Sequence, residues 1–321
     1  MKKISVCVIC YNQEEYILEC LSSIFNQKGN FLLEVVIRDD CSSDKTREIC
    51  ESYIKNITDD KITIKLLDSR VNLGANKNSL EVLKNCTGDF VAFCEGDDYW
   101  TSEYKLQKQL NLANENPKIN LFVHLAYFHY PNGELIKKDW PLLTHKTLSQ
   151  SKILSANWQF APTSSYFIRS PVLSFLPDWY DNATIGDIYL EIYSARNGIG
   201  VIDEYLSAYR YLSQNSWSLS LTRNTPEILD KKIKHYNNFI SCLELTELDF
   251  PNLKNEINIK KKGLMIQLAK LYFLNKNKIE GENLIKKIKL LPCSLNLKEK
   301  IILILIKKPR LLKFISEIKI Q

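Results

Sequence analysis

The sequence predicts an α/β fold, in which a mostly parallel sheet flanked by helices is followed by a helical C-terminal region. Strand-like and helix-like segments alternate through about the first hundred residues, and strands joined by helical crossovers pair in parallel. Polar and acidic residues stand directly after each predicted strand. From about residue 225 onward the chain is helical in pattern and rich in lysine. We therefore expect two domains, residues 1–222 and residues 223–321.

The predicted sheet begins with four strands. Short runs rich in β-branched and other apolar residues predict these strands at residues 4–10, 33–40, 62–68 and 89–94. Apolar residues at helical spacing predict helices between them, at residues 14–25, about 43–53 and about 75–85. Later segments are less regular, with strand-like patterns over 119–170 and 200–212 and a helix over 186–196. Ligands of such sheets bind beyond the carboxyl ends of the strands.

Composition and charge narrow the classes of function. The 321 residues are 45% hydrophobic, and no apolar run reaches 18 residues, so we expect no membrane-spanning helix. The first apolar stretch has only seven residues and is followed by YNQEEY, which favours a first strand over a secretion signal. Residues 281–321 carry ten Lys/Arg and three Glu, a net charge of +7, which leaves −1 on the rest of the chain. A near-neutral body argues against binding to nucleic acid.

The nine cysteines are expected to be reduced thiols. Cys7 and Cys10 form a CxxC pattern, but on one strand they point to opposite faces, and no second CxxC or His pair completes a zinc site. Free cysteines of this kind are usually buried.

The segment DFVAFCEGDDYW gathers three carboxylates after the fourth predicted strand. Glu95, Asp97 and Asp98 stand within four positions, and like charges that close raise one another's pKa values. Such a cluster suits Mg²⁺ or Mn²⁺, which takes one or two protein carboxylates and completes its shell with water and substrate phosphate. The alternative is a strand-ending turn with solvated acids, since Asp and Gly favour turns.

Asp39 and Asp40 follow the second predicted strand. Their carboxylates can accept hydrogen bonds from a nucleoside, and an Asx turn before a helix is the structural alternative. No GxGxxG follows the first strand and no GxxxxGK[ST] occurs, so a diphosphate would not be held in the Rossmann or P-loop manner. A metal-held diphosphate is the better hypothesis.

Taken together, the motifs resemble a known family. ISVCVICYNQEEYILECLSSIFNQ, VVIRDDCSSDKT, NLGANKN and FVAFCEGDDYW, with later pieces such as FAPTSSYFIR and IGDIYL, resemble family 2 glycosyltransferases with the GT-A fold, of the bacterial cell-surface polysaccharide type. The resemblance covers about residues 4–218. It implies an inverting, metal-assisted transfer of a sugar from a nucleotide-diphosphate donor, expected to be a UDP-sugar, to a saccharide or lipid-linked acceptor.

The resemblance also implies roles for single residues. The implied nucleotide-binding residues are Tyr11, Asn12, Asp39, Asp40, Lys77, Glu95 and Asp97. Among them, Asp40 matches the family's uracil-contacting acid. Asp98 is the first expected ligand of Mn²⁺ or Mg²⁺, with Asp97 beside it. Asp187 matches the catalytic base, although the residues alone favour a helix N-cap at this position.

Other positions depart from the family or are less specific. Leu212 stands where many relatives have a His that can ligate metal. Tyr209, Arg210 and Trp217 are expected to line the acceptor cleft, because aromatic faces stack on sugars; ordinary packing is an equal alternative for Tyr209 and Trp217.

The basic C-terminal tail suits more than one partner. Residues 296–319 mix Ile/Leu with Lys/Arg, which suits an anionic membrane surface or an amphipathic helix packed on its own domain or on a twin subunit in a homodimer. The expected location is the cytoplasm, with peripheral contact at the inner face of the cell membrane as an open option.

Three other functions compete with a metal-dependent glycosyltransferase. Leu212 departs from the family, and so do Ile185 and Ile188, which stand around Asp187 where close relatives often carry His and Trp. These departures leave open a nucleotide-sugar-binding homologue with impaired or lost catalysis. A nucleotidyltransferase would carry a Gly- and Lys/Arg-rich phosphate loop after the first strand, where this chain has Tyr11-Asn12-Gln13. A membrane-bound scaffold would keep its function in an Asp98→Asn variant.

Overall fold

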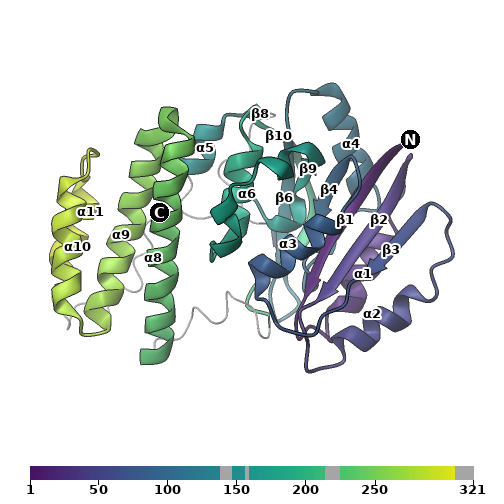
Figure 1. Ribbon diagram of the computed structural model, residues 1–321, viewed down its shortest axis with the longest axis horizontal. Helices are drawn as coiled ribbons and strands as arrows, with labels where there is room; N and C mark the ends of the chain where they lie inside the picture. The colour runs from purple at the N-terminus through teal and green to yellow at the C-terminus, as the bar shows by residue number, and fades with distance from the viewer. Residues whose placement is uncertain (138–146, 156–158, 214–224, 308–321) are drawn as a thin grey trace. The chain divides into compact units, whose positions relative to one another are not determined.

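A computed structural model gives the structure of the chain and describes residues 1–137, 147–155, 159–213 and 225–307 (Figure 1). The chain divides into two compact units. One comprises Met1–Ile153 with Gln159–Leu219, and the other comprises Leu154–Trp158 with Ser220–Gln321. The domain boundary at residue 222 stays a prediction. No helix among the described residues is both long and apolar enough to cross a membrane.

The first unit is built on one sheet with the strand order β3-β2-β1-β4-β9-β6-β10-β5. Its strands are β1 (Lys2–Cys10), β2 (Phe31–Asp39), β3 (Ile62–Leu66), β4 (Phe90–Phe93), β5 (Tyr99–Trp100), β6 (Leu121–His129), β7 (Leu135–Lys137), β8 (Thr147–Leu148), β9 (Phe167–Arg169) and β10 (Ile199–Arg210). The first four strands pair in parallel, as the helical crossovers predict. The rest of the sheet is mixed, because β10 runs parallel to β6 while β5, β7, β8 and β9 pair antiparallel with their neighbours.

Helices cover this sheet as the α/β class requires. They are α1 (Ile17–Phe25), α2 (Thr46–Ile54), α3 (Ala75–Asn85), α4 (Lys105–Glu115), α5 (Gln150–Ser155) and α6 (Gly186–Ser194), with 3₁₀ helices η1 (Thr163–Ser165), η2 (Ser170–Phe175) and η3 (Asp178–Asn182). Helix α1 buries Ile17, Cys20, Leu21 and Ile24 at helical spacing against the core residues of β1 and β2. It starts later than predicted, because the Gln13 carbonyl accepts the amides of Tyr16 and Ile17 in a turn.

The cysteines agree with the expectation of free thiols. All nine lie in the described residues and none is in a disulfide, and six of them are buried. The Sγ atoms of Cys20 and Cys94 lie 3.7 Å apart, within the core under the carboxyl end of β4.

A buried carboxylate ties the parallel strands together. Glu34 of β2 is fully buried, and its oxygens accept hydrogen bonds from Ser5 Oγ of β1 at 2.5 Å and from Thr87 N at 2.7 Å, in the turn before β4. Lys3 Nζ of β1 and Lys65 Nζ of β3 lie 2.9 and 3.0 Å from Glu34 Oε1. Burial acts to raise the pKa of Glu34, but the hydrogen bonds from Ser5, Thr87 and Lys3 outweigh it and lower the pKa to about 2.

The second unit is helical. Its helices are α8 (Pro226–Asp249), η4 (Pro251–Leu253), α9 (Lys254–Leu274), α10 (Lys278–Leu290) and α11 (Leu297–Leu305). Pro251 begins η4 and Pro292 follows α10, so neither lies in the interior of a helix, where its missing amide hydrogen would break a hydrogen bond. Thr225, Asn277 and Asn296 cap α8, α10 and α11, each accepting an amide three residues on. A core of Met265, Ile266, Ala269, Phe273, Ile285, Ile288, Ile302, Leu303 and Ile306 joins α9, α10 and α11.

We expect Glu34→Gln to lower the free energy of unfolding by about 3 kcal/mol, because buried donors and two lysines lose their anionic acceptor. The pKa of Glu34 is depressed in the fold, so its contribution is present above pH 4.5 and is lost as the pH falls toward about 2. Urea denaturation across this range should therefore show the variant and the wild type converging in acid. Glu81→Gln, which removes an exposed helix pair with Lys84, serves as the control and should cost far less. A variant as stable as the wild type at neutral pH would contradict the prediction.

Candidate functional site

The loops after β2 and β3 are joined by Asp40. Its buried carboxylate accepts the amides of Leu73 and Gly74, both at 2.8 Å, and Arg38 Nη1 at 2.7 Å. The Asn72 side chain also donates to the Asp40 carbonyl at 3.0 Å. Gly74 adopts a φ of +80° at this close approach, a conformation that favours glycine. Asp40 therefore holds the Asn72–Gly74 loop at the carboxyl end of β2.

The loop after β1 is bound to the loop after β2. Asn12 N donates to Ser42 Oγ at 2.8 Å, and Ser43 N donates to Asn12 Oδ1 at 2.8 Å. Asn12 and Cys41 adopt positive φ angles of 50° and 64°, which non-glycine residues rarely do outside such hydrogen-bonded turns. The Asp39 carboxylate accepts Ser42 N at 3.1 Å and lies buried beneath the turn.

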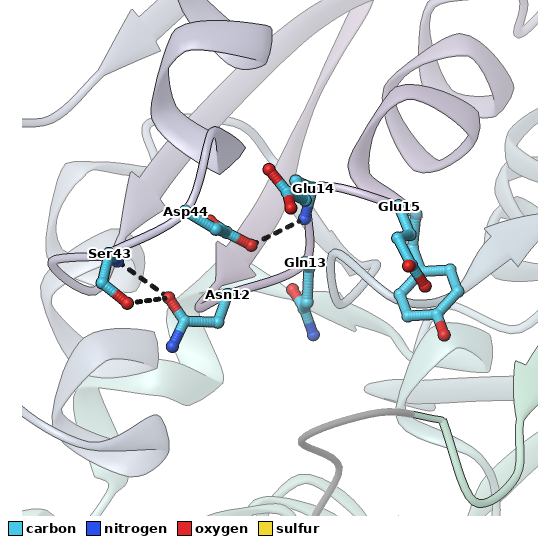
Figure 2. A pocket seen from close by; sticks show the side chains of 7 residues that line it. Asn12, Gln13, Glu14, Glu15, Ser43 and Asp44 are labelled. Carbon is cyan, nitrogen blue, oxygen red and sulfur yellow. Dashed lines mark hydrogen bonds between the residues drawn. The ribbon is translucent and has the colours of Figure 1, made fainter.

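These two loops enclose a polar pocket of about 210 Å³. It is lined by Asn12, Gln13, Glu14, Glu15, Tyr16, Ser43 and Asp44, as Figure 2 shows. Asp44 closes one side, because its carboxylate accepts Glu14 N at 3.1 Å, while the Glu14 carboxylate accepts Lys45 N at 3.0 Å. The pocket therefore lies at the carboxyl edge of β1 and β2, where ligands of parallel sheets bind.

The acidic turn after β4 lies against the loop after β1. Gly96 N donates to the Ile9 carbonyl at 2.9 Å, and Asp98 N closes the turn on the Glu95 carbonyl at 2.9 Å. A Cβ on Gly96 would come within 2.4 Å of Gln13 Oε1 and 2.7 Å of Cys10 Cβ, so this position requires glycine. The ends of β1, β2, β3 and β4 are thus in contact along one edge of the sheet, as parallel pairing requires.

Arg210, at the end of β10, holds the acidic turn from the other side. Its amide donates to Asp98 Oδ1 at 3.0 Å and its Nη1 donates to the Asp97 carbonyl at 2.5 Å. The guanidinium also pairs with Glu19 of α1 and lies between the rings of Tyr16 and Tyr99, 4.9 and 4.7 Å from their centroids. In this structure Arg210 is a buried link between α1, β10 and the acidic turn. Its role toward an acceptor stays a prediction.

The carboxylates of the turn all have pKa values above their usual range. Burial, the charge of Asp97 and the charge of Asp187 raise the pKa of Glu95 to about 8. Burial also raises the pKa of Asp97, against a hydrogen bond from Ser213 Oγ at 3.0 Å. Burial, Asp97 and Glu95 together raise the pKa of Asp98 well above its usual range. A cation at this turn would remove the repulsion.

The donor set fits a hard divalent cation. Asp98 Oδ2 is buried and makes no hydrogen bond to the described residues, and carboxylate oxygens are the ligands that Mg²⁺ and Mn²⁺ prefer. Asp97 is only half-buried and is the more accessible of the pair. The described part of the chain holds no group of three His, Cys, Asp or Glu side chains arranged around a metal. Such a site would therefore complete its shell with water and ligand oxygens.

Asp187 lies in the first turn of α6, near enough to the acidic turn for its charge to contribute to the raised pKa of Glu95. The helix N-cap is Ile185, so Asp187 is not the cap, although its Oδ1 accepts Ile188 N at 3.0 Å. A Cβ on Gly186 would come within 1.8 Å of Asn76 Oδ1, so α6 begins in close contact with α3. Burial raises the pKa of Asp187 to about 6.

Glu191 is a member of this site that the sequence reasoning missed. It lies one helical turn after Asp187, is buried, and accepts Phe160 N at 3.0 Å, Ala161 N at 2.9 Å and Tyr166 Oη at 2.6 Å. It therefore fastens the segment before η1 and β9 to α6. The sequence signal that could have identified Glu191 is its position four residues after Asp187, in a helix whose other residues are mostly apolar.

The structure places the remaining predicted residues as follows. Lys77 is exposed in the first turn of α3, and Tyr11 is exposed after β1. Tyr209 packs edge-on against Phe128 of β6, with ring centroids 5.4 Å apart, which is the packing alternative for this residue. Leu212 follows β10 with a φ of +62°. Trp217 lies outside the described residues, and its role stays a prediction.

Comparison with known proteins identifies sequence relatives. The sequence model of the family described as "Glycosyl transferase family 2" matches residues 5–172. The poly(ribitol-phosphate) beta-N-acetylglucosaminyltransferase TarS of Staphylococcus aureus is 40% identical over 221 residues, 65% of this chain and 34% of that protein. A Campylobacter jejuni protein named as a GalNAc(5)-diNAcBac-PP-undecaprenol beta-1,3-glucosyltransferase is 26% identical over 271 residues, 81% of this chain and 77% of that protein.

An uncharacterized Mycobacterium tuberculosis protein is 32% identical over 220 residues, and the chain spans 61% of its length. Two solved structures share the fold. TarS in complex with UDP-GlcNAc aligns with a TM-score of 0.56 and 18% identity, covering 90% of both chains. The mannosyltransferase PcManGT of Pyrobaculum calidifontis, in complex with GDP-Man and Mn²⁺, aligns with a TM-score of 0.56 and 12% identity, covering 99% of this chain and 88% of that chain. At these identities the likeness shows the GT-A fold alone.

In metal-free protein we expect the acidic turn to lower stability as the pH rises. The pKa of Glu95 is about 8 in the fold against a usual value of 4.5, so the folded state binds more protons between these values and loses stability as the pH increases through them. Glu95→Gln removes this penalty. Its stability relative to the wild type, measured by urea denaturation in the presence of EDTA, should therefore increase from pH 5 to pH 8. Glu115→Gln, an exposed acid of α4, should show no such trend, and a constant difference for Glu95→Gln would contradict the prediction.

Proposed function

The chain belongs to glycosyl transferase family 2, and from this premise we propose that it transfers a sugar from a nucleotide-diphosphate donor, a UDP-sugar, to a saccharide or lipid-linked acceptor of a cell-surface polysaccharide. The observation that carries the proposal is the acidic turn Glu95–Asp98, whose carboxylates have raised pKa values and lie at the carboxyl edge of the sheet, within electrostatic reach of Asp187. Binding of a cation and a diphosphate at this turn would explain why it is acidic.

In this proposal the nucleoside binds at the loops after β1 and β2. Asn12, Asp39 and Asp40 line or support these loops, and the amide and carboxylate groups offer acceptors for ribose hydroxyls and for an imide N–H. Asp40 already accepts three donors, so its first effect is to hold the Leu73–Gly74 segment in place. Lys77, exposed at the start of α3, is free to reach toward a diphosphate from the same edge.

The acidic turn would hold the divalent cation through Asp98 and Asp97. Asp98 Oδ2 is the buried oxygen that lacks a hydrogen-bond partner among the described residues. A bound Mn²⁺ or Mg²⁺ supplies charge neutralisation for the departing nucleoside diphosphate. Arg210 positions both aspartates, since it binds the Asp98 carboxylate through its amide and the Asp97 carbonyl through its guanidinium.

Asp187 would act as the general base. An acceptor hydroxyl attacks the anomeric carbon of the donor sugar and forms the new glycosidic bond, while the bond to the β-phosphate oxygen breaks and the nucleoside diphosphate leaves. Asp187 takes the hydroxyl proton. Direct attack from the face opposite the leaving group inverts the anomeric configuration. A pKa of about 6 keeps the carboxylate ionised at neutral pH yet basic enough to accept a proton.

A second candidate is a nucleotide-sugar-binding homologue with impaired catalysis. The observation that favours it is Leu212, which follows β10 at the position where many relatives carry a metal-ligating His. This candidate predicts donor binding with no sugar transfer in the presence of metal and acceptor.

We expect release of nucleoside diphosphate from one UDP-sugar that requires Mn²⁺ or Mg²⁺. Asp187→Asn removes the base and should lower turnover roughly 10²- to 10⁴-fold, while binding of UDP, measured by calorimetry, stays close to wild type. Asp98→Asn should remove the metal dependence and weaken UDP binding. Asp203→Asn, an exposed acid of β10, is the control and should leave both measurements unchanged. Binding of UDP-sugar without turnover toward any saccharide or lipid-linked acceptor would favour the second candidate.

The pH dependence of turnover offers a separate measurement. Because Asp187 must be ionised to accept a proton and its pKa is raised to about 6, the rate at saturating donor should rise as the pH increases through about 6 and then level off. The residual activity of Asp187→Asn should lack this rise. A wild-type rate that is constant from pH 5 to pH 8 would exclude Asp187 as the base that limits turnover.

A further inference from the structure

Helix α11 carries an apolar stripe on its exposed side. Leu297, Ile301 and Ile304 are 76%, 47% and 61% exposed. Their spacing of four and three residues places them on one line along the helix. Single exposed apolar residues are common on proteins, but three aligned on one short helix form a continuous surface feature.

The opposite side of α11 determines how the helix is turned. Ile302, Leu303 and Ile306 are buried in the core shared with α9 and α10. Glu299 is buried as well, accepts Lys262 Nζ of α9 at 2.9 Å and completes a capping box with Asn296. The helix is therefore held in one orientation about its axis, and the stripe faces outward because the other face is packed.

Lysines border this stripe. At about 100° per residue, Lys300 and Lys307 fall on one side of it and Lys298 on the other, and all three are exposed. Lys307 lies just beyond the helix and pairs with Glu282 at 2.7 Å. The single acid of α11, Glu299, is on the packed side. The exposed side of α11 is thus apolar along its centre and positively charged along its borders.

Helix α10 has a similar exposed side. Ile279 and Leu290 are 75% and 83% exposed, and eleven residues, about three helical turns, separate them, so they share one line along the helix. Lys286 lies on the same line and is exposed, and Lys287 and Lys289 are exposed near it. Both helices of this part of the unit therefore combine exposed Ile or Leu with exposed lysine.

We propose that the exposed side of α11, extended by α10, is a docking surface for an anionic lipid bilayer. Apolar side chains on such a helix enter the headgroup boundary, while bordering lysines bind anionic headgroups. A second copy of the chain fits less well, because a two-fold contact of this surface with itself would bring lysines against lysines. The inference rests on the C-terminal unit alone and is independent of the transferase activity.

The experiment is co-sedimentation of the full chain with vesicles of phosphatidylcholine, with and without phosphatidylglycerol. We expect binding that requires phosphatidylglycerol and weakens with salt. Leu297→Gln/Ile301→Gln/Ile304→Gln removes the stripe but keeps helix propensity, and should lower the partition coefficient more than tenfold. Lys298→Gln/Lys300→Gln should lower it by roughly fivefold per lysine, the equivalent of about 1 kcal/mol each.

Matched substitutions in the same unit serve as controls. Leu248→Gln replaces a leucine of α8 that is 76% exposed, and Lys231→Gln/Lys234→Gln replaces two exposed lysines of α8; neither should change vesicle binding. Far-UV circular dichroism and thermal unfolding confirm that each variant is folded. Failure of the wild type to bind phosphatidylglycerol vesicles, or equal binding by the stripe variant, would overturn the proposal. Light scattering that shows a dimer dissociated by the stripe variant, without vesicle binding, would assign the surface to a second copy.

Discussion

The carboxylate of Glu34 is the interaction on which the parallel half of the sheet depends. It is fully buried in β2, yet it receives hydrogen bonds or ion pairs from β1, from β3 and from the turn before β4. A buried charge is tolerated only when its oxygens are satisfied by donors. Here satisfying it requires that the strands lie in one register. The carboxyl ends of β1, β2 and β4 are aligned as a result, and the candidate site is built on those ends.

The acidic turn after β4 is electrostatically the opposite case. The pKa of Glu34 is lowered to about 2 because hydrogen-bond donors surround its carboxylate. The pKa of Glu95 is raised to about 8 because it is buried and lies near other carboxylates. The protein thus satisfies one buried carboxylate completely and leaves another group of them in mutual repulsion. Packing alone does not require that repulsion, and the proposed site for a cation and an anionic ligand would account for it.

Long-range contacts then bring the rest of the site to this turn. Arg210 reaches the acidic turn from the end of β10, and Glu191 binds the segment before η1 from within α6. The Trp100 indole donates to the Ser164 carbonyl of η1 at 3.1 Å, and Gln109 of α4 donates to the Ser165 carbonyl at 2.7 Å. The segment from Phe160 to Ser165 is therefore bound both by Trp100, two residues after the acidic turn, and by Glu191, four residues after Asp187.

The sequence by itself determined the parallel half of the sheet and the residues at its edge. Apolar runs of β-branched residues give β1 to β4, helical spacing gives α1 to α3, and both signals are local. The polar residues after each strand had to converge, because crossovers make the strands parallel. Only the tertiary structure decided the mixed pairing of β5 to β10, the burial of Asp98 under Arg210 and the binding of Glu191 to Phe160 and Ala161. These depend on residues far apart in the chain, 112 positions in the case of Asp98 and Arg210, and no local pattern encodes which distant donor a buried carboxylate will meet.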